Sequence, residues 1–466
     1  MLHSLLSYGD NLHYEKFSNG SVKCIEDEVP FGLPDGWAWV RLGNLSVAIQ
    51  YGLSNSAEPQ GTHRLLRITD IQDGKVDWNA VPFTTVNDPE AYLLKTGDIV
   101  FARTGATVGK SFLITETPYP SVYASYLIRI RLLGSLSPEY IYQFFDSACY
   151  WSQITDKSVG VGQPNCNGTS LKELFIPLPP ISEQLRIVPT AQALLAYVAK
   201  IDAEKKSLLS IIMATKSKIL DLAIRGQLIP QDPNDEPASV LLERIRAEKE
   251  ELIKQGKIKR DKKESVIFRG EDNSYYEKID MKVRCINIEI PFDLPETWCW
   301  CRLGTLFDHN TGKALNSADS AGTPMTYITT SNLYWDRFEL DSLKEMLFAD
   351  SEIDKCTVKK GDLLVCEGGD IGRSAIWMFE ENIRIQNHIH RLRPYISLSS
   401  RFYYYVMYMW KQLGLIGGQG IGLQGFSSKM LHNLIVPLPS IDEQERIVAF
   451  IDKLFEQIES IEKSLS

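Results

Sequence analysis

Two glycine-rich segments come closest to a nucleotide-binding motif. Residues 104–111 read Thr-Gly-Ala-Thr-Val-Gly-Lys-Ser and end like a phosphate-binding loop, whose backbone amides and lysine hold phosphate oxygens. That motif needs glycine at its first position, where this sequence has Thr104. A similar segment, residues 367–374, has Glu367 at the first position, where its charge would repel phosphate, and Arg373 in place of the lysine. We interpret both segments as tight glycine turns between strands, each with a basic tip.

Other catalytic and metal-binding patterns are missing. The sequence has no His-Glu-x-x-His, Gly-x-Ser-x-Gly or Cys-x-x-Cys pattern, and no Asn/Asp-Pro-Pro-Tyr/Phe segment like that of amino-methyltransferases. His388 and His390 share one strand face, but two ligands without a third are a weak metal site, so we expect hydrogen-bonded histidines. A nuclease that used Asp98 and Glu367 would need a matched acid pair in both copies, and none is found. We therefore expect neither a metal site nor an active site.

Composition places the chain among globular proteins of two or three domains. It has 466 residues, 44% of them hydrophobic and 23% charged, and no apolar run long enough for a membrane span. Eight cysteines show no disulfide framework, and Cys299 and Cys301 lack a metal-binding spacing, so we expect free thiols and a cytoplasmic location. The net charge of −9 disfavours a protein that grips a long duplex alone. This net charge is compatible with local basic grooves, or with a partner that supplies most phosphate contacts.

An internal repeat organises the whole sequence. Three blocks recur in the same order about 260 residues apart: a Trp-x-Trp-x-Arg-Leu-Gly beginning, a Lys-x-Gly-Asp centre and a Pro-Leu-Pro-x-Ile-x-Glu-Gln end. These blocks are residues 30–43 and 291–304, residues 95–98 and 359–362, and residues 176–184 and 436–444. Between the blocks the copies diverge strongly. The pattern indicates one scaffold used twice, with different surfaces.

Each copy is expected to be mixed α/β. Alternating apolar residues predict strands over 37–42 and 123–132, with a counterpart at 383–393, and helices are predicted over 138–147 and 401–413. Four tryptophans near the start of the copies are expected to pack in the core or against a helix rather than stack on bases. They are Trp37, Trp39, Trp298 and Trp300.

Each copy leads into a helical segment. Apolar residues at steps of three and four predict a helix over about 182–225, roughly 65 Å long, that ends near Gly226. The second copy repeats the spacing but ends at Ser466, so its helix is expected to be much shorter. We expect the two helices to pack as an antiparallel coiled coil, the alternative being a helix laid over a domain core. The expected spacer and partner residues are Leu194, Val198, Ile201, Leu208, Ile212, Ile451, Leu454 and Ile458.

A further amphipathic helix is predicted over 238–255. The lysine-rich segment 254–263 that follows is either a solvated linker or an arm that contacts phosphates.

The duplicated beginning and end, each followed by a helix, resemble the specificity subunit of type I restriction-modification systems. So does the segment 224–245, with Ile-Arg-Gly-Gln-Leu, Asp-Glu-Pro-Ala and Leu-Leu-Glu-Arg-Ile. The resemblance covers nearly the whole chain. It implies two pseudo-twofold-related target-recognition domains separated by long antiparallel coiled-coil helices. The implied domains are an N-terminal extension (1–28), a first target-recognition domain (29–180), a central helical spacer region (181–264), a linker (265–289), a second target-recognition domain (290–440) and a C-terminal spacer helix (441–466).

The resemblance also implies a task and partners. Each domain would read one half of a bipartite, gapped double-stranded DNA target. The helices would set the gap and dock methyltransferase subunits, expected to be two, and through them restriction subunits. S-adenosylmethionine, ATP and magnesium would then belong to the partners, with no cofactor in this chain. A duplicated DNA-binding module without a methyltransferase partner is the alternative.

Base-reading residues should be polar, lie on loops and differ between the copies, whereas phosphate contacts should be basic. The candidates in the first copy are Tyr51, Ser54, Asn55, Arg103, Thr104, Lys110, Gln163, Asn165 and Asn167. Those in the second copy are Thr311, Lys313, Asn316, Arg373, Gln419 and Gln424.

Overall fold

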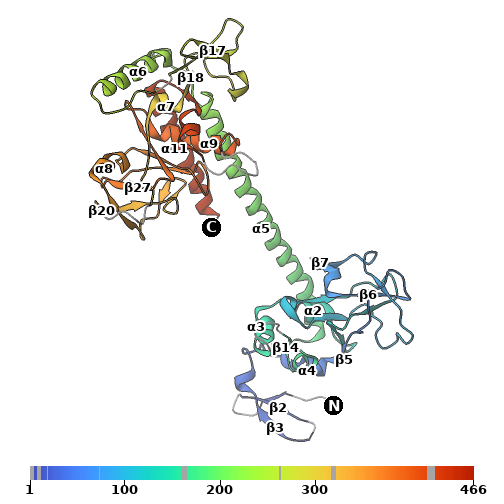
Figure 1. The fold of residues 1–466 in the computed structure, drawn as a ribbon. Coiled ribbons are helices and arrows are strands. Elements are labelled where there is room, and N and C mark those ends of the chain that lie inside the picture. The colour runs from blue at the N-terminus through green and yellow to red at the C-terminus, as the bar shows by residue number, and fades with distance from the viewer. Residues whose placement is uncertain are drawn as a thin grey trace. The chain divides into compact units, whose positions relative to one another are not determined.

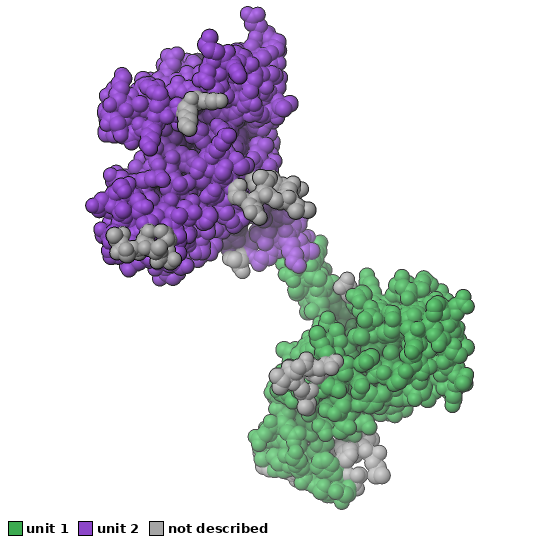
Figure 2. Space-filling model, viewed as in Figure 1, with its two compact units in different colours: residues 1–202 green, residues 203–466 purple. Residues whose placement is uncertain are grey.

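The chain forms two compact units. The computed structural model describes residues 5–7, 12–17, 19–72, 74–158, 165–261, 264–315, 322–416 and 426–465. Unit 1 comprises residues 1–202 and unit 2 residues 203–466, coloured green and purple in Figure 2. The helix α5 (Ile181–Ile224) contributes residues to both (Figure 1).

A four-stranded antiparallel sheet is the centre of each unit, with the same order of equivalent strands. The order is β11-β10-β13-β5 in unit 1 and β26-β25-β28-β19 in unit 2. Strands β10 and β25 are buried at every residue, which explains their continuous apolar sequences. The bounds are β5 (Ser46–Tyr51), β10 (Ile99–Ala102), β11 (Ser111–Leu113), β13 (Leu127–Leu132), β19 (Phe307–Thr311), β25 (Leu363–Cys366), β26 (Ser374–Ile376) and β28 (Ile389–Pro394).

A second sheet lies beside the first in each unit, with strand order β12-β6-β9 in unit 1 and β23-β20-β27-β24 in unit 2. The predicted strands over 123–132 and 383–393 each divide between the two sheets. The chain pairs in one sheet, turns, and pairs in the other, which a continuous alternating sequence does not reveal. The bounds are β6 (His63–Leu66), β9 (Phe83–Thr84), β12 (Ser121–Tyr123), β20 (Thr323–Ile328), β23 (Lys344–Phe348), β24 (Thr357–Val358) and β27 (Ile383–Ile385).

The Lys-x-Gly-Asp block is a turn fixed by an ion pair. The buried Asp98 carboxylate accepts hydrogen bonds from Arg131 Nε and Nη2, both at 2.7 Å, and from the Lys95 amide at 2.8 Å. Asp362 makes the equivalent bonds with Arg393 and Lys359. These aspartates therefore serve the fold, and Asp98 is not available as a nuclease acid.

The tryptophan beginning and the Pro-Leu-Pro end of each copy pair as two antiparallel strands. In unit 1, β4 (Ala38–Arg41) pairs with β14 (Phe175–Leu178), which brings Trp39 opposite Pro177. In unit 2, β18 (Cys299–Arg302) pairs with β29 (Ile435–Leu438) in the same register. Trp39 and Trp300 are each 1% exposed, which agrees with their predicted packing role.

The Glu-Gln dipeptide ties the following helix to its unit. Gln184, in the first turns of α5, accepts a hydrogen bond from the Ser137 amide at 3.1 Å and donates to the Pro179 carbonyl at 2.9 Å. At the start of α11 (Ile441–Ser464), Gln444 makes the same two bonds with Ser399 and Pro439. Both glutamines are buried, so water cannot take their place as the hydrogen-bond partner of these backbone groups.

The neighbouring glutamates bind the first tryptophan of each copy. Trp37 Nε1 donates to Glu183 at 3.2 Å, and Trp298 Nε1 donates to Glu443 at 2.8 Å. Burial raises the pKa of Glu443, although the hydrogen bonds from Trp298 and Gln231 oppose that shift. The two ends of each repeat thus converge where the helix begins.

A three-stranded antiparallel sheet precedes each copy, where the sequence predicts an extension and a linker. Arg41 binds Glu15 of the first sheet and Glu28 of the turn that follows it, and Arg302 binds Glu277 and Glu289 at the equivalent places around the second sheet. The bounds are β1 (Leu5–Ser7), β2 (His13–Lys16), β3 (Val22–Cys24), β15 (Ser265–Arg269), β16 (Tyr275–Ile279) and β17 (Lys282–Cys285).

Within unit 2, α11 runs antiparallel to the C-terminal part of α5. Lys216 pairs with Glu462 at 2.8 Å, and Gln231, just beyond α5, binds Glu443 at the opposite end of α11. Ile212 and Ile451 are buried, whereas Leu454 and Ile458 are half-buried. The predicted antiparallel pairing is confirmed for this part of α5. The other expected spacer residues are exposed: Leu194, Val198, Ile201 and Leu208.

The remaining predicted helices are present. They are α2 (Pro138–Phe144), α6 (Ala238–Lys254) and α9 (Ser400–Gln412). After α2 the chain starts a new helix, α3 (Ala148–Lys157), because the Ser147 hydroxyl caps it through the Tyr150 amide. Within the described residues, no helix is long and apolar enough to cross a membrane.

The glutamine ties give a stability prediction. Gln444→Ala leaves the half-buried Ser399 amide without its acceptor, so we expect unit 2 to lose about 2 kcal/mol of local stability. Hydrogen exchange measured by mass spectrometry should show faster exchange at the start of α9 and no change at the start of α2. Gln184→Ala should give the reverse. Gln457→Ala, on the exposed face of α11, is the control; an equal effect from it would contradict the assignment.

Candidate recognition site

In unit 1, several predicted residues meet at the turn that follows β10. Thr104 forms an isolated bridge with Asn165, and the Cys166 amide donates to the Arg103 carbonyl at 2.9 Å. Tyr51 lies beside them at the end of β5, and its hydroxyl accepts a hydrogen bond from the Gly168 amide at 2.8 Å. The sheet and the segment near 166 therefore bring residues from three distant parts of the sequence together.

Arg103 is the cation of this cluster. Its guanidinium lies 5.0 Å from the centre of the Tyr51 ring, and its buried Nε has no hydrogen-bond partner among the described residues. A guanidinium held against an aromatic ring keeps its planar N–H groups in a fixed orientation. Such a group can bind a phosphate, or the two acceptors on the major-groove edge of guanine.

Asn167 has a structural role. Its side-chain oxygen accepts hydrogen bonds from the Thr169 and Ser170 amides, both at 2.9 Å, and so caps α4 (Gly168–Lys172). Only its amide N–H groups remain for an outside partner.

The other candidates of unit 1 are in different settings. Ser54 is exposed, and Asn55 donates to the Thr85 carbonyl at 3.1 Å. Lys110 is exposed at the far end of the glycine turn, where it lines a separate groove. Gln163 lies outside the described residues.

The structural counterpart of Arg103 in unit 2 is Glu367. The Glu367 carbonyl accepts from the Phe426 amide at 2.8 Å, as the Arg103 carbonyl accepts from Cys166. Matching the sequences without a gap places Glu367 opposite Thr104, which is wrong by one residue because the second turn is one residue shorter. The left-handed glycines of the turn show this: Gly105 and Gly109 in unit 1 correspond to Gly369 and Gly372 in unit 2. Equivalent positions thus carry opposite charges.

A pair of histidines positions the segment that meets Glu367. His390 Nε2 lies 2.8 Å from the Phe426 carbonyl oxygen, and its Nδ1 lies 3.0 Å from His309 Nε2. Burial lowers the pKa of His309 to about 3 and also lowers that of His390. Both rings are therefore neutral near pH 7. Within the described ranges no group of three or more His, Cys, Asp or Glu residues is arranged to hold a metal ion.

The remaining candidates of unit 2 are in different settings. Thr311 ends β19 opposite His390. Lys313 is only 9% exposed and binds Glu352 at 2.7 Å and the Leu347 carbonyl at 2.8 Å, so its ammonium group serves an internal ion pair in this structure. Arg373 donates to the Thr330 carbonyl at 2.6 Å and lies over the Tyr334 ring. Asn316, Gln419 and Gln424 lie outside the described residues.

Three residues at these turns are absent from the base-reading candidates of the sequence analysis: Tyr126, Glu367 and His388. The Tyr126 and His388 carbonyls accept from the Arg103 and Glu367 amides, so the two side chains occupy equivalent positions, and both are exposed. His388 lies 3.7 Å from Glu367. The sequence could have indicated these residues, because they are polar or aromatic and differ between the copies at equivalent positions. Finding them requires the correct alignment of the two turns.

Comparison with known proteins gives a consistent result. The family model for the type I restriction modification DNA specificity domain matches residues 36–211 and 295–466, which together are more than half of the chain. The EcoAI specificity subunit of Escherichia coli is 23% identical, with 92% of this chain and 79% of that protein covered. The EcoBI specificity subunit of the same species is 23% identical, with 97% and 86% covered. The HsdS subunit from Thermoanaerobacter tengcongensis has a similar fold, with a TM-score of 0.57, 19% identity and 94% of each chain covered.

The histidine pair predicts a pH-dependent stability. Because the pKa of His309 is lower in the folded state than in the unfolded chain, its stabilising contribution is present above about pH 6.5 and is lost as the pH falls toward 3. His309→Gln should flatten the decline of the free energy of unfolding of unit 2 by roughly 4 kcal/mol across that range. Urea unfolding at several pH values measures this effect. An unchanged slope in His309→Gln, or the same flattening in the exposed His388→Gln control, would contradict the prediction.

Proposed function

The chain belongs to the type I restriction-modification DNA specificity family, and on that premise we propose that its two units each read one half of a bipartite double-stranded DNA target. As a specificity subunit it is not itself an enzyme. The observation that carries the proposal is the pair of equivalent turns, alike in backbone and opposite in charge at Arg103 and Glu367.

The chemistry of these two residues favours different bases. Arginine donates two hydrogen bonds to the O6 and N7 acceptors of guanine, whereas glutamate accepts from the N4 amino group of cytosine. Glu367 would also be repelled by phosphates, so phosphate contacts in unit 2 must come from other residues. The two half-sites should therefore differ, which gives an asymmetric target.

The long helix suggests how the two readers are spaced. With 44 residues, α5 extends about 66 Å, close to two turns of B-DNA at about 34 Å each. We infer that α5 and α11 set the gap between the half-sites.

The same helices would dock the partners. Leu194, Val198 and Ile201 are 61%, 55% and 62% exposed, an apolar stripe that favours a protein partner. We expect two methyltransferase subunits to bind along the helices and restriction subunits to join through them. The partners would supply S-adenosylmethionine, ATP and magnesium, since we expect none of these in this chain.

The proposed function predicts a methylation pattern. A genome-wide map of N6-methyladenine is compared between cells that hold the chain with its methyltransferase and cells that lack the chain. We expect a chain-dependent motif of two short, different halves with a fixed gap. If no mark depends on the chain while the methyltransferase is expressed, a DNA-binding module without a methyltransferase is the better reading.

A single substitution should affect one half of that motif. Arg103→Ala removes a positioned guanidinium, so we expect the affinity for the target to fall by tenfold or more, with relaxed preference in one half only. Competition binding with duplexes altered in each half measures this loss. Arg186→Ala, on the exposed surface of α5, is the matched control. Equal losses for all duplexes would instead make Arg103 a phosphate contact.

A further inference from the structure

A short hairpin follows the first strand of the second sheet in both units. In unit 1 it consists of β7 (Ile71–Gln72) and β8 (Lys75–Val76), and in unit 2 of β21 (Leu333–Tyr334) and β22 (Arg337–Phe338). Each turn contains one residue in the left-handed region, Gly74 with φ 69° and Asp336 with φ 57°. These residues fix the alignment of the two hairpins.

In unit 2 the tip of the hairpin is docked on α9. Trp335 makes edge-on contacts with Tyr404 and Tyr408, with ring centres 6.2 and 5.1 Å apart. Beside it, the Asp336 carboxylate pairs with Arg401 of the same helix. An aromatic side chain and an adjacent charge thus close the space between hairpin and helix.

The equivalent contacts cannot form in unit 1. Ser137 and Ser399 cap α2 and α9 and make the same bond to the glutamine of the spacer helix, which aligns the two helices. In sequence, Trp335 and Asp336 correspond to Asp73, which lies outside the described residues, and Gly74. On the helix, Arg401, Tyr404 and Tyr408 correspond to Glu139, Tyr142 and Asp146.

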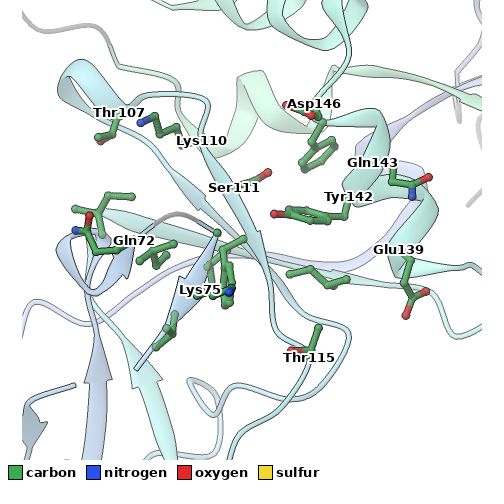
Figure 3. Close-up of a pocket in the computed structure, with 18 of the residues that line it drawn as sticks. Gln72, Lys75, Thr107, Lys110, Ser111, Thr115, Glu139, Tyr142, Gln143 and Asp146 are labelled. Atoms are coloured by element: carbon green, nitrogen blue, oxygen red, sulfur yellow. The ribbon is translucent and has the colours of Figure 1, made fainter. Parts of the chain in front are cut away.

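A cavity of about 1140 Å³ lies between the hairpin and α2 in unit 1. Figure 3 shows Gln72 and Lys75 on the hairpin side and Glu139, Tyr142 and Gln143 on the helix side, with the Tyr142 ring directed across the cavity. Apolar side chains that include Trp78 and Phe112 contribute to its walls. The volume exceeds what one side chain needs and suits a short peptide segment.

We propose that this groove of unit 1 binds a segment of a partner protein in which an aromatic side chain stands next to a basic one. The aromatic side chain takes the place that Trp335 has in unit 2. The basic side chain pairs with Glu139, which replaces Arg401, so the charge of the ligand is the reverse of that of Asp336.

The charges around the groove disfavour DNA as the occupant. Glu116, Glu139 and Asp146 line it together with Lys75 and Lys110, so the carboxylates outnumber the ammonium groups. A phosphate backbone would meet this acidic helix side, whereas a peptide can match both signs. Leu195 of α5 also lines the groove and is 55% exposed, so the apolar surface continues onto the helix.

The test uses cyclic peptides copied from the chain itself. The probe is residues 331–340 with Asp336→Lys, labelled with fluorescein, and its binding to the full chain is measured by fluorescence anisotropy. We expect it to bind about fivefold more tightly than the peptide with the natural Asp336, because one opposite-charge contact replaces a like-charge one. The chain variant Glu139→Arg should invert this preference, whereas Glu90→Arg, an exposed carboxylate outside the groove, should not.

Replacement of Trp335 by alanine in the probe should abolish binding, and this arm does not depend on any protein variant. The proposal would be overturned if the alanine probe bound as tightly as the tryptophan probe, or if neither the Asp336→Lys peptide nor the natural peptide bound at all. A short DNA duplex could displace the probe. If it does, and if binding of the duplex is weakened by Lys110→Ala and not by Glu139→Arg, the groove would be assigned to nucleic acid instead. Neither a DNA target nor a methyltransferase is needed, so failure here leaves the proposed function standing.

Discussion

A buried glutamine at the start of α5 and another at the start of α11 tie each helix to the strands and helix that precede it. Gln184 and Gln444 each bridge a helix cap on one side and the Pro-Leu-Pro strand on the other. The preceding glutamate holds the tryptophan that begins the repeat. Because the two glutamines are buried, a shift of the helix would leave their polar atoms unsatisfied, at a cost of about 1–3 kcal/mol each. The direction in which each helix leaves its unit is therefore fixed by the most repetitive part of the sequence.

The strands, helices and buried contacts that the two units share form a common frame. Within it, the side chains of the turns after β10 and β25 can vary. Their backbones are held by main-chain hydrogen bonds to neighbouring segments, none of which depends on the exposed side chains. The charge at Arg103 can therefore become that of Glu367 without disturbing the fold. The same independence explains how the hairpin can be closed by Trp335 in unit 2 and remain open in unit 1.

The sequence predicts the frame better than the site. The repeat and the helix α5, which begins and ends within one residue of its predicted bounds, follow from regular periodicity. The passage of 123–132 between two sheets is not visible, because an alternating pattern continues through it. Nor is the internal ion pair of Lys313 visible, since its partner Glu352 is 39 residues away and depends on tertiary structure. Aligning the two turns by their residue types is wrong by one residue. The left-handed glycines define the equivalent positions, and their spacing is one residue shorter in the second turn.

The central claim is that two independent readers share one duplicated frame. It is tested most directly by a chain in which a second copy of residues 29–180 replaces residues 290–440, expressed with its methyltransferase. Mapping of N6-methyladenine in those cells should give a bipartite motif with two identical half-sites in opposite orientation, because both turns would then carry Arg103. An unchanged asymmetric motif, from a chain shown to be folded and assembled, would contradict the account.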